Sequence, residues 1–344
     1  MVRRIITVAV VLTCLVLAVV WGIWHLIGNR ESQTTGLPSI DELAALPYVT
    51  WVPVDETEFS KSGVTLYHPD LCHDGINFYF TENKPGGHFF DMSGNVLHRF
   101  SDNRSEPGNW QLVEPYQAGH FLVIVQSEAM FMIDWNSNIQ WELQGGFHHN
   151  VTIDESGDIY TLMHGKIDAP DFSSTEPVRN DWLVILTKDG EIKKKISFVD
   201  LLRKKKKLYE AAINREEKRY EFGKDAWDLF HSNSVQLIDR DVYSGDQRLF
   251  KKGDVLFCAR HQNLIGAIDV EAEEIVWYWG PDDLDFPHHA SLLENDRILI
   301  FDNVFHDDYS RVIELDPATG EVAWEYKADP PQSFRSPTRG CAQR

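Results

Sequence analysis

The sequence predicts an all-β fold, a β-propeller, on two observations. Short apolar or alternating runs are separated by turn-forming clusters such as Ser93-Gly94-Asn95 and Lys188-Asp189-Gly190, which is typical of strands joined by tight turns. One unit recurs: an apolar strand, a polar turn and a second strand that often ends in Trp, seen most clearly in residues 132–141, 267–277 and 314–324. The residues before the five turns stand at 91, 134, 187, 269 and 316, at intervals of 43, 53, 82 and 47 residues. These intervals indicate propeller blades of about 40–50 residues, because one blade cannot bury both of its faces alone.

The first thirty residues differ from the rest of the chain. Arg3 and Arg4 precede an apolar run of 23 residues, 5–27, which is long enough to span a bilayer and longer than the core of a signal peptide. No small-x-small cleavage site and no lipobox-like Cys follow it, so an uncleaved anchor is favoured over a cleaved signal. The arginines predict that residues 1–4 are a cytoplasmic tail and that the propeller is periplasmic or extracellular.

Composition limits the remaining possibilities. Hydrophobic residues make up 43% and aromatic residues 12% of the chain, which predicts a packed core. The net charge of −20 would repel a nucleic acid, so nucleic acid is excluded as a partner. Cys14 lies in the anchor, and the odd number left, Cys72, Cys258 and Cys341, shows no disulfide framework and no CxxC metal knuckle.

Residues 28–45 form a predicted polar linker, and residues 46–344 form the predicted propeller domain. The longest interval contains an insertion, residues 198–228, with apolar residues at helical spacing, which predicts a helical excursion. Its basic run at 203–207 is compatible with contact to lipid headgroups or to an anionic ligand, but a solvated helix face is favoured.

Several of the fourteen histidines stand where strands begin. In a propeller the first strand of each blade lines the central channel, so polar residues at these places converge although they are far apart in sequence. The candidates are His148 and His149 before residues 151–153, His231 and Asn233 before 235–237, Arg260 after 255–257, and His288 and His289 before 290–293. For any one histidine alone, capping a strand or a loop carbonyl is the simpler explanation, and recurrence in three or four blades favours a shared site. A three-histidine zinc site of His148, His231 and His288 is a weaker alternative because no HxH or HExxH spacing occurs, and no metal site is predicted.

Three segments resemble the bacterial arylsulfotransferase family. Residues 228–235 (DLFHSNSV) resemble its H-x-N-S segment, residues 253–269 its next strand pair with a functional arginine, and residues 287–303 its Q-H-D…L-L-F-D-N segment. Residues 63–67 and 147–150 also fit, so the resemblance covers about residues 60–344. It implies a six-bladed propeller that transfers a sulfuryl group from a phenolic sulfate ester to a phenol through a sulfohistidine, without a nucleotide sulfate donor. The sequence agrees in having no GxxxxGK[ST] loop, and no cofactor is expected.

The resemblance also implies roles for the candidate residues. His288 takes the place of the nucleophile, Arg260 and His231 bind the sulfuryl oxygens, His148 or His149 assists with proton transfer or charge, and Asn233 and His289 are expected to contact substrate. Arginine and histidine around a nucleophilic imidazole would suffice for this chemistry without a metal.

The chain departs from the family pattern in three places. Pro287-His288-His289 stands in place of Q-H-D, and His148-His149-Asn150 in place of the commoner H-H-D, so His289 is expected to orient the nucleophile. Residues 336–344 resemble the start of a segment that continues into a further blade, which predicts an incomplete sixth blade or a fragment.

The main alternative function is a propeller of this family that binds a ligand or partner without catalysis. A metal- or quinone-dependent enzyme is a third possibility.

Overall fold

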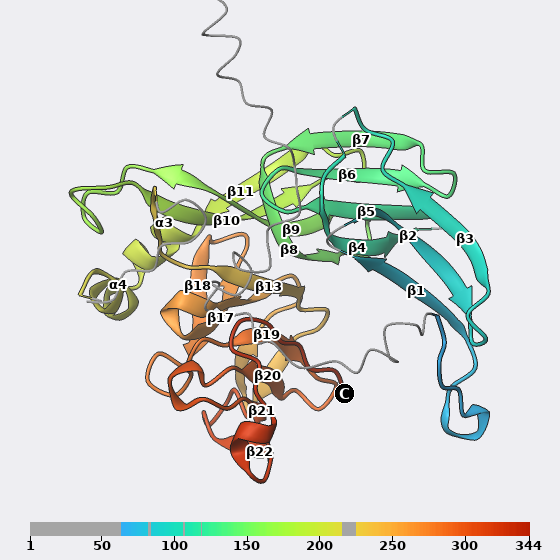
Figure 1. Cartoon of the computed structure of the whole chain (residues 1–344). Helices are drawn as coiled ribbons and strands as arrows, with labels where there is room; N and C mark the ends of the chain where they lie inside the picture. The colour runs from blue at the N-terminus through green and yellow to red at the C-terminus, as the bar shows by residue number, and fades with distance from the viewer. Residues whose placement is uncertain (1–62, 82–83, 106, 118, 215–224) are drawn as a thin grey trace, which may run out of the picture. The chain divides into compact units, whose positions relative to one another are not determined.

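The computed structural model describes residues 63–81, 84–105, 107–117, 119–214 and 225–344, all within one compact unit, Ser60–Arg344. These residues form a β-propeller of five antiparallel blades that follow one another along the chain (Figure 1). The predicted tail, anchor and linker, residues 1–45, lie outside the described residues. No helix in the described ranges is long and apolar enough to cross a bilayer.

The first blade has three strands, and each of the others has four on its main hydrogen-bonded path. The first blade contains β1 (Ile76–Thr81), β2 (Lys84–Asp91) and β3 (Val96–Ser101). The second contains β4 (Trp110–Tyr116), β5 (His120–Val125), β6 (Ala129–Asp134) and β7 (Ile139–Gln144). The third contains β8 (Gly146–Ile153), β9 (Ile159–Ile167), β10 (Val178–Leu186) and β11 (Ile192–Ser197), with β12 (Trp227–Asp228) parallel to β10.

The fourth blade contains β13 (Ser232–Leu237), β16 (Val255–Ala259), β17 (Leu264–Asp269) and β18 (Glu274–Trp279). A separate hairpin, β14 (Val242–Ser244) and β15 (Gln247–Phe250), interrupts it between β13 and β16. The fifth contains β19 (His288–Leu292), β20 (Ile298–Asp302), β21 (Arg311–Leu315) and β22 (Val322–Lys327). Two short 3-10 helices in the described residues lie between strands, η3 (Arg260–Gln262) and η4 (Phe305–Asp307), while η2 (Pro69–Leu71) precedes β1 and η5 (Pro331–Ser333) follows β22.

The prediction of a β-propeller is confirmed, but the expectation of six blades is wrong for the described residues. Each of the five recurring turns joins the last two strands of one blade, so the number of turns in the sequence equals the number of described blades. Residues 336–344, where a sixth blade was expected to begin, contain no strand. They run back to the fifth blade, where Ser336 N–H donates to Ser310 Oγ (2.8 Å) and Asn303 Nδ2 donates to the Arg339 carbonyl (3.1 Å).

The residue before each recurring turn holds the turn closed. In the second blade, Asp134 Oδ1 accepts hydrogen bonds from the backbone N–H groups of Asn136 and Asn138, both at 2.8 Å. Asp91, Asp269 and Asp316 accept backbone N–H groups of their own turns in a similar way. A short side chain that mimics a backbone turn explains why four of the five units have Asp at this position. In the third blade, Thr187 Oγ1 accepts the N–H groups of Asp189 and Glu191 in the same way.

The recurring Trp connects the second blade to the third and the fourth blade to the fifth. Trp141 Nε1, in the second blade, donates to the Lys188 carbonyl in the turn of the third blade (3.0 Å). Trp277 Nε1, in the fourth blade, donates to the Pro317 carbonyl in the turn of the fifth (3.0 Å). Trp324 occupies the same place in the fifth blade and is 41% exposed.

Replacing Trp277 with Phe is expected to lower the free energy of unfolding by about 1 kcal/mol, because the Pro317 carbonyl loses its donor. The melting temperature would fall by roughly 2–4 °C. Trp324→Phe is the matched control and is expected to change the melting temperature by much less. Equal shifts for the two variants in a thermal melt would contradict a role of the Trp277 hydrogen bond.

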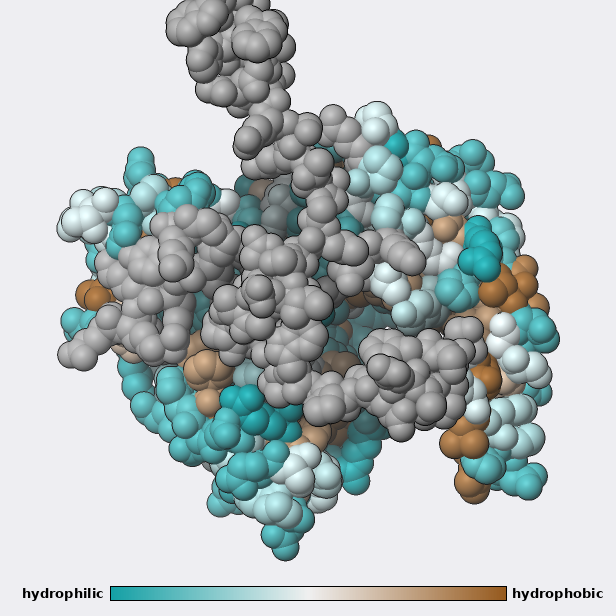
Figure 2. All heavy atoms as spheres, in the orientation of Figure 1, coloured by the Kyte–Doolittle hydropathy of each residue, from teal (hydrophilic) through white to brown (hydrophobic). Residues whose placement is uncertain are grey.

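Four apolar clusters fill the spaces between neighbouring blades. One contains Val123 and Phe131 beside Phe100, the next Leu122 and Val184, and the others join the third to the fourth and the fourth to the fifth blade. Figure 2 shows a largely hydrophilic face with brown side chains near the first blade, where Ile76, Val96 and Leu97 are exposed. The blades are therefore held together mainly by burial of apolar surface between sheets.

The described part of the insertion contains two short helices, α3 (Phe198–Lys204) and α4 (Lys206–Ile213), as predicted. Ser197 caps α3 through the Asp200 N–H, and α3 buries apolar side chains in the core between the third and fourth blades. In the basic run, Arg203 pairs with Asp171 (2.8 Å) and Lys204 donates to the Glu273 carbonyl (2.8 Å). These contacts within the protein favour the interpretation of this run as a solvated helix face over a lipid-binding patch.

The first strands of the second to fifth blades are joined by side chains. Gln111 Oε1 on β4 accepts the His149 N–H (2.7 Å), Asn150 Oδ1 on β8 accepts the Val235 N–H (2.9 Å), and Ser234 Oγ on β13 accepts the Ala290 N–H (3.2 Å). The pairing register of each of these strands shifts near the same place. Bulges of this kind redirect side chains beside functional sites.

Candidate functional site

The predicted histidines lie where these irregular first strands meet. His148 is in β8, His231 directly precedes β13, and His288 begins β19. Backbone φ is positive at His149 (63°), His231 (47°) and His289 (47°), a region that residues other than Gly rarely adopt. Such strain close to the starts of three first strands is typical of a functional site.

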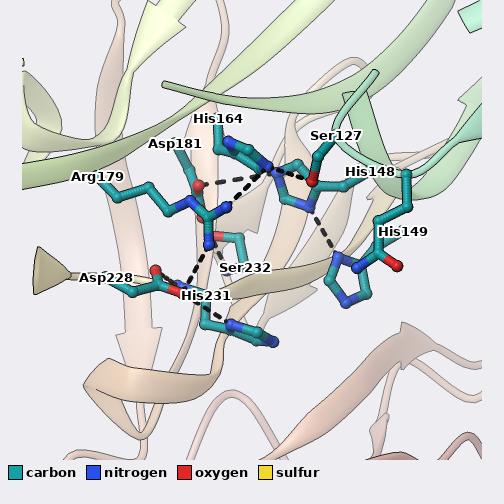
Figure 3. Close-up of a pocket in the computed structure, with 10 residues that line it drawn as sticks. Ser127, His148, His149, His164, Arg179, Asp181, Asp228, His231 and Ser232 are labelled. Carbon is teal, nitrogen blue, oxygen red and sulfur yellow. Dashed lines mark hydrogen bonds and ion pairs between the residues drawn. The ribbon is translucent and has the colours of Figure 1, made fainter. Parts of the chain in front are cut away.

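Four histidines form a continuous row beside a small cavity (Figure 3). The ring centroid of His148 lies 5.1 Å from that of His164 and 5.0 Å from that of His149, which lies 5.5 Å from that of His231. His148 Nδ1 and His149 Nδ1 share a hydrogen bond of 2.7 Å. Burial lowers the pKa of His148 well below its usual value and that of His164 to about 4, so both rings are uncharged at neutral pH.

Asp228, which is buried, fixes the orientation of His231. Its Oδ2 accepts His231 Nδ1 (2.9 Å), its Oδ1 accepts the His231 N–H (3.1 Å), and Arg179 Nη1 lies 3.4 Å from Oδ2. Burial alone would raise the pKa of Asp228, but the hydrogen bond of His231 and the positive charge of Arg179 are among the interactions that lower it far below its usual range. Asp228 is therefore ionised, and His231 presents Nε2 away from it.

Arg260 is placed by its neighbours at the end of β16. Its Nη1 donates to His261 Nε2 (2.9 Å), and its guanidinium stacks over the Phe286 ring at 4.3 Å. Because arginine can only donate, His261 carries its proton on Nδ1, which donates to the Asp228 carbonyl (2.9 Å). The cation is 6% exposed and its direction is set by the stack and the hydrogen bond.

The tautomer of His288 is fixed by Asn303. The amide Nδ2 of Asn303 donates to the carbonyls of Ser336 and Arg339, so its Oδ1 faces His288. His288 Nδ1 lies 2.6 Å from this oxygen and must be the donor, which leaves the lone pair on Nε2. Burial and the nearby charge of Arg260 lower the pKa of His288 to about 3, so the ring is neutral and nucleophilic at Nε2.

The structure corrects the expectation that His289 orients the nucleophile. His289 Nδ1 is buried without a hydrogen-bond partner among the described residues, and Asn303 is the side chain bonded to His288. Asn233, expected to contact substrate, bonds to the backbone on both sides of His288: its Nδ2 donates to the Pro287 carbonyl (2.9 Å) and its Oδ1 accepts the His289 N–H (3.2 Å). The left-handed backbone of His289 directs its side chain differently from that of its neighbour.

A group of possible metal ligands lies in the site, but it is not the three-histidine set that was the weaker alternative in the sequence. Donor atoms of Asp228, His231 and His261 lie within 4.8 Å of one another. Both nitrogens of His261 already have partners, the Asp228 carbonyl and Arg260, and Arg179 adds a second cation beside Asp228. These residues fit a hydrogen-bonded cluster better than a metal site.

Several residues of the site were not predicted from the sequence. Asp228, His261 and Asn303 stand in or beside the segments that carry the family resemblance, and their position there was a usable signal. His164, Arg179 and Asp181 lie on β9 and β10, second and third strands of their blade, where no pattern in the sequence points to a site.

The fold and this site define a β-propeller with a histidine- and arginine-rich centre where its first strands meet. A family model described as arylsulfotransferase (ASST) matches residues 145–344, and the chain belongs to this family. The match spans every candidate residue named above. A search of curated proteins finds no match. Among solved structures, the chain is similar to a crystal structure of a protein of unknown function from Bacteroides caccae, with 10% identity, a TM-score of 0.48, and coverage of 75% of this chain and 74% of that one.

Proposed function

We propose that this chain transfers a sulfuryl group from a phenolic sulfate ester to a phenol through a sulfohistidine at His288. The observation that carries the proposal is the state of this imidazole. It is buried and neutral, and Asn303 holds it in the tautomer whose Nε2 bears the lone pair. Membership of the arylsulfotransferase family supports the reaction class.

In the first half-reaction, His288 Nε2 bonds to the sulfur while the bond from sulfur to the donor oxygen breaks. The electron pair of that bond leaves with the donor as a phenolate, which then takes up a proton. In the second half-reaction, the oxygen of the acceptor phenol bonds to the sulfur and the N–S bond breaks, which returns the electron pair to Nε2. The proton of the acceptor phenol is released, so no oxidant, reductant or nucleotide is consumed.

Arg260 and His231 are the groups proposed to hold the sulfuryl oxygens. A sulfuryl group in transfer, like a phosphoryl group, is stabilised mainly by positioned donors and positive charge. The charges of Arg260 and His231 both lower the pKa of His288. Their own orientations are fixed, by the Phe286 stack and by Asp228 respectively, so little reorganisation is needed during the reaction.

The test is a transfer assay on the full chain with 4-nitrophenyl sulfate as donor and phenol as acceptor. We expect nitrophenolate release that depends on the phenol, together with phenyl sulfate as a product. Release without any phenyl sulfate would indicate hydrolysis instead of transfer. No turnover by the folded protein, with saturable binding of the sulfate ester in calorimetry, would favour the alternative of a non-catalytic binding propeller.

A further inference from the structure

A second buried carboxylate lies beside the histidine row and has no part in the reaction described so far. Asp181, on β10, is 1% exposed, and its Oδ2 accepts the Ser232 N–H (2.8 Å). Its Oδ1 lies 3.7 Å from His148 Nε2 (Figure 3). That nitrogen is buried and has no hydrogen-bond partner among the described residues. A buried polar atom without a partner needs an explanation, because leaving it unpaired costs free energy.

The cavity beside these two groups is too small for a substrate. The volume open to the centres of water molecules is about 20 Å³, lined by residues that include Ser127, Arg179 and Ser232. This volume suits one water molecule and excludes an aromatic ring. The cavity therefore has room for a water molecule, and His148 and Asp181 both line it.

The two buried carboxylates of the site have opposite environments. Asp228 is paired with His231 and Arg179 and stays ionised. Burial, and then the negative charge of Asp228, raise the pKa of Asp181 to about 7, although Ser232 and the charge of His231 oppose the shift. His164 and Arg179, the other titratable or charged groups facing the cavity, bond to each other (3.2 Å). When the environments of two carboxyl groups separate their pKa values in this way, one group typically holds a proton while the other stays ionised.

We propose that Asp181 is the proton reservoir of the transfer reaction, connected to the site by His148 and His149. This inference rests on the proposed function. In the first half-reaction, protonated Asp181 gives its proton to His148 Nε2, His148 passes the Nδ1 proton to His149 Nδ1, and the remote nitrogen of His149 protonates the departing phenolate. In the second half-reaction, the proton of the acceptor phenol follows the same path in reverse. Both tautomers and the carboxyl group are thereby restored in each cycle.

Asp181→Asn tests the relay because it keeps the shape of the side chain and removes the proton reservoir. The donors to compare are phenyl sulfate, whose phenolate leaves poorly without a proton, and 4-nitrophenyl sulfate, whose phenolate is a good leaving group. We expect kcat/KM to fall by about 10²-fold or more with phenyl sulfate and by less than about 3-fold with 4-nitrophenyl sulfate. Asp254→Asn, a buried carboxylate outside the cavity, is the matched control and is expected to show no dependence on the donor.

An equal loss with both donors, or no loss with either, would overturn the relay while wild-type activity still supports the proposed function. Absence of wild-type transfer would instead overturn the proposed function itself. If Asp181→Asn does not fold, as judged by circular dichroism and thermal melting, His148→Gln interrupts the same path and is expected to show the same donor dependence. A loss in that variant that is equal for both donors would overturn the relay.

Discussion

Replacing His288 with alanine is expected to lower kcat for sulfuryl transfer by at least about 10³-fold, because the covalent route loses its nucleophile. Incubation of the wild-type chain with a 35S-labelled aryl sulfate, followed by rapid quenching, is expected to leave label on His288, located by peptide mass spectrometry. The variant is expected to retain no label. Because His288 is buried, its substitution is also expected to lower stability, so a thermal melt must accompany the assay.

His289→Ala is the control for this experiment. His289 is adjacent in sequence and partly buried, but it contacts its neighbours through the backbone N–H and its Nδ1 has no partner among the described residues. We expect this variant to keep kcat within about tenfold of the wild type, below the effect of removing a nucleophile, and to retain the label on His288. Label that persists in His288→Ala, or that disappears in His289→Ala alone, would assign the nucleophile to another histidine.

The parts of the fold that repeat along the chain were predictable from the sequence. The Asp-turn unit and the Trp that follows it are local sequence patterns. Asp134 bonds within its own turn, and Trp277 bonds to the turn of the next blade. The number of blades was overestimated because the sixth came from the family resemblance. Residues 336–344 instead turn back to bond Asn303 and Ser310.

The candidate site was predictable only in part, for a physical reason. Residues at the starts of first strands share a position that the sequence reveals, and so His148, His231 and His288 were found. The partners that set their protonation come from other strands or from the chain's last residues. Asp181 stands on a third strand 33 residues after His148, and the carbonyls that orient Asn303 belong to Ser336 and Arg339. Such contacts depend on tertiary packing and leave no periodic trace in the sequence.

Replacing Asn303 with leucine, which has a similar shape, is expected to lower kcat by about 10²-fold with little change in KM. The Leu side chain cannot accept the His288 Nδ1 proton, so the ring is free to adopt either tautomer and Nε2 is no longer always the unprotonated nitrogen. The loss is expected to be smaller than the roughly 10⁴-fold effect of a partner that enforces the wrong tautomer. NMR of 15N-histidine-labelled protein would check the cause, since the wild type is expected to show the Nδ1–H tautomer at His288 and the variant a mixture.

Asn303→Asp tests, through the pH dependence of the rate, whether residue 303 controls the protonation of His288. A carboxylate beside Nδ1 stabilises the imidazolium and raises the pKa of His288 from about 3. The first half-reaction needs the neutral ring, so its rate is lost at every pH below the new pKa, and the acid limb of the pH–rate profile moves to higher pH. In the wild type, His288 is not expected to limit the rate above about pH 4, because its charged form is rare there. An acid limb that stays in place in Asn303→Asp, with normal folding, would show that Asn303 does not control the protonation of the nucleophile.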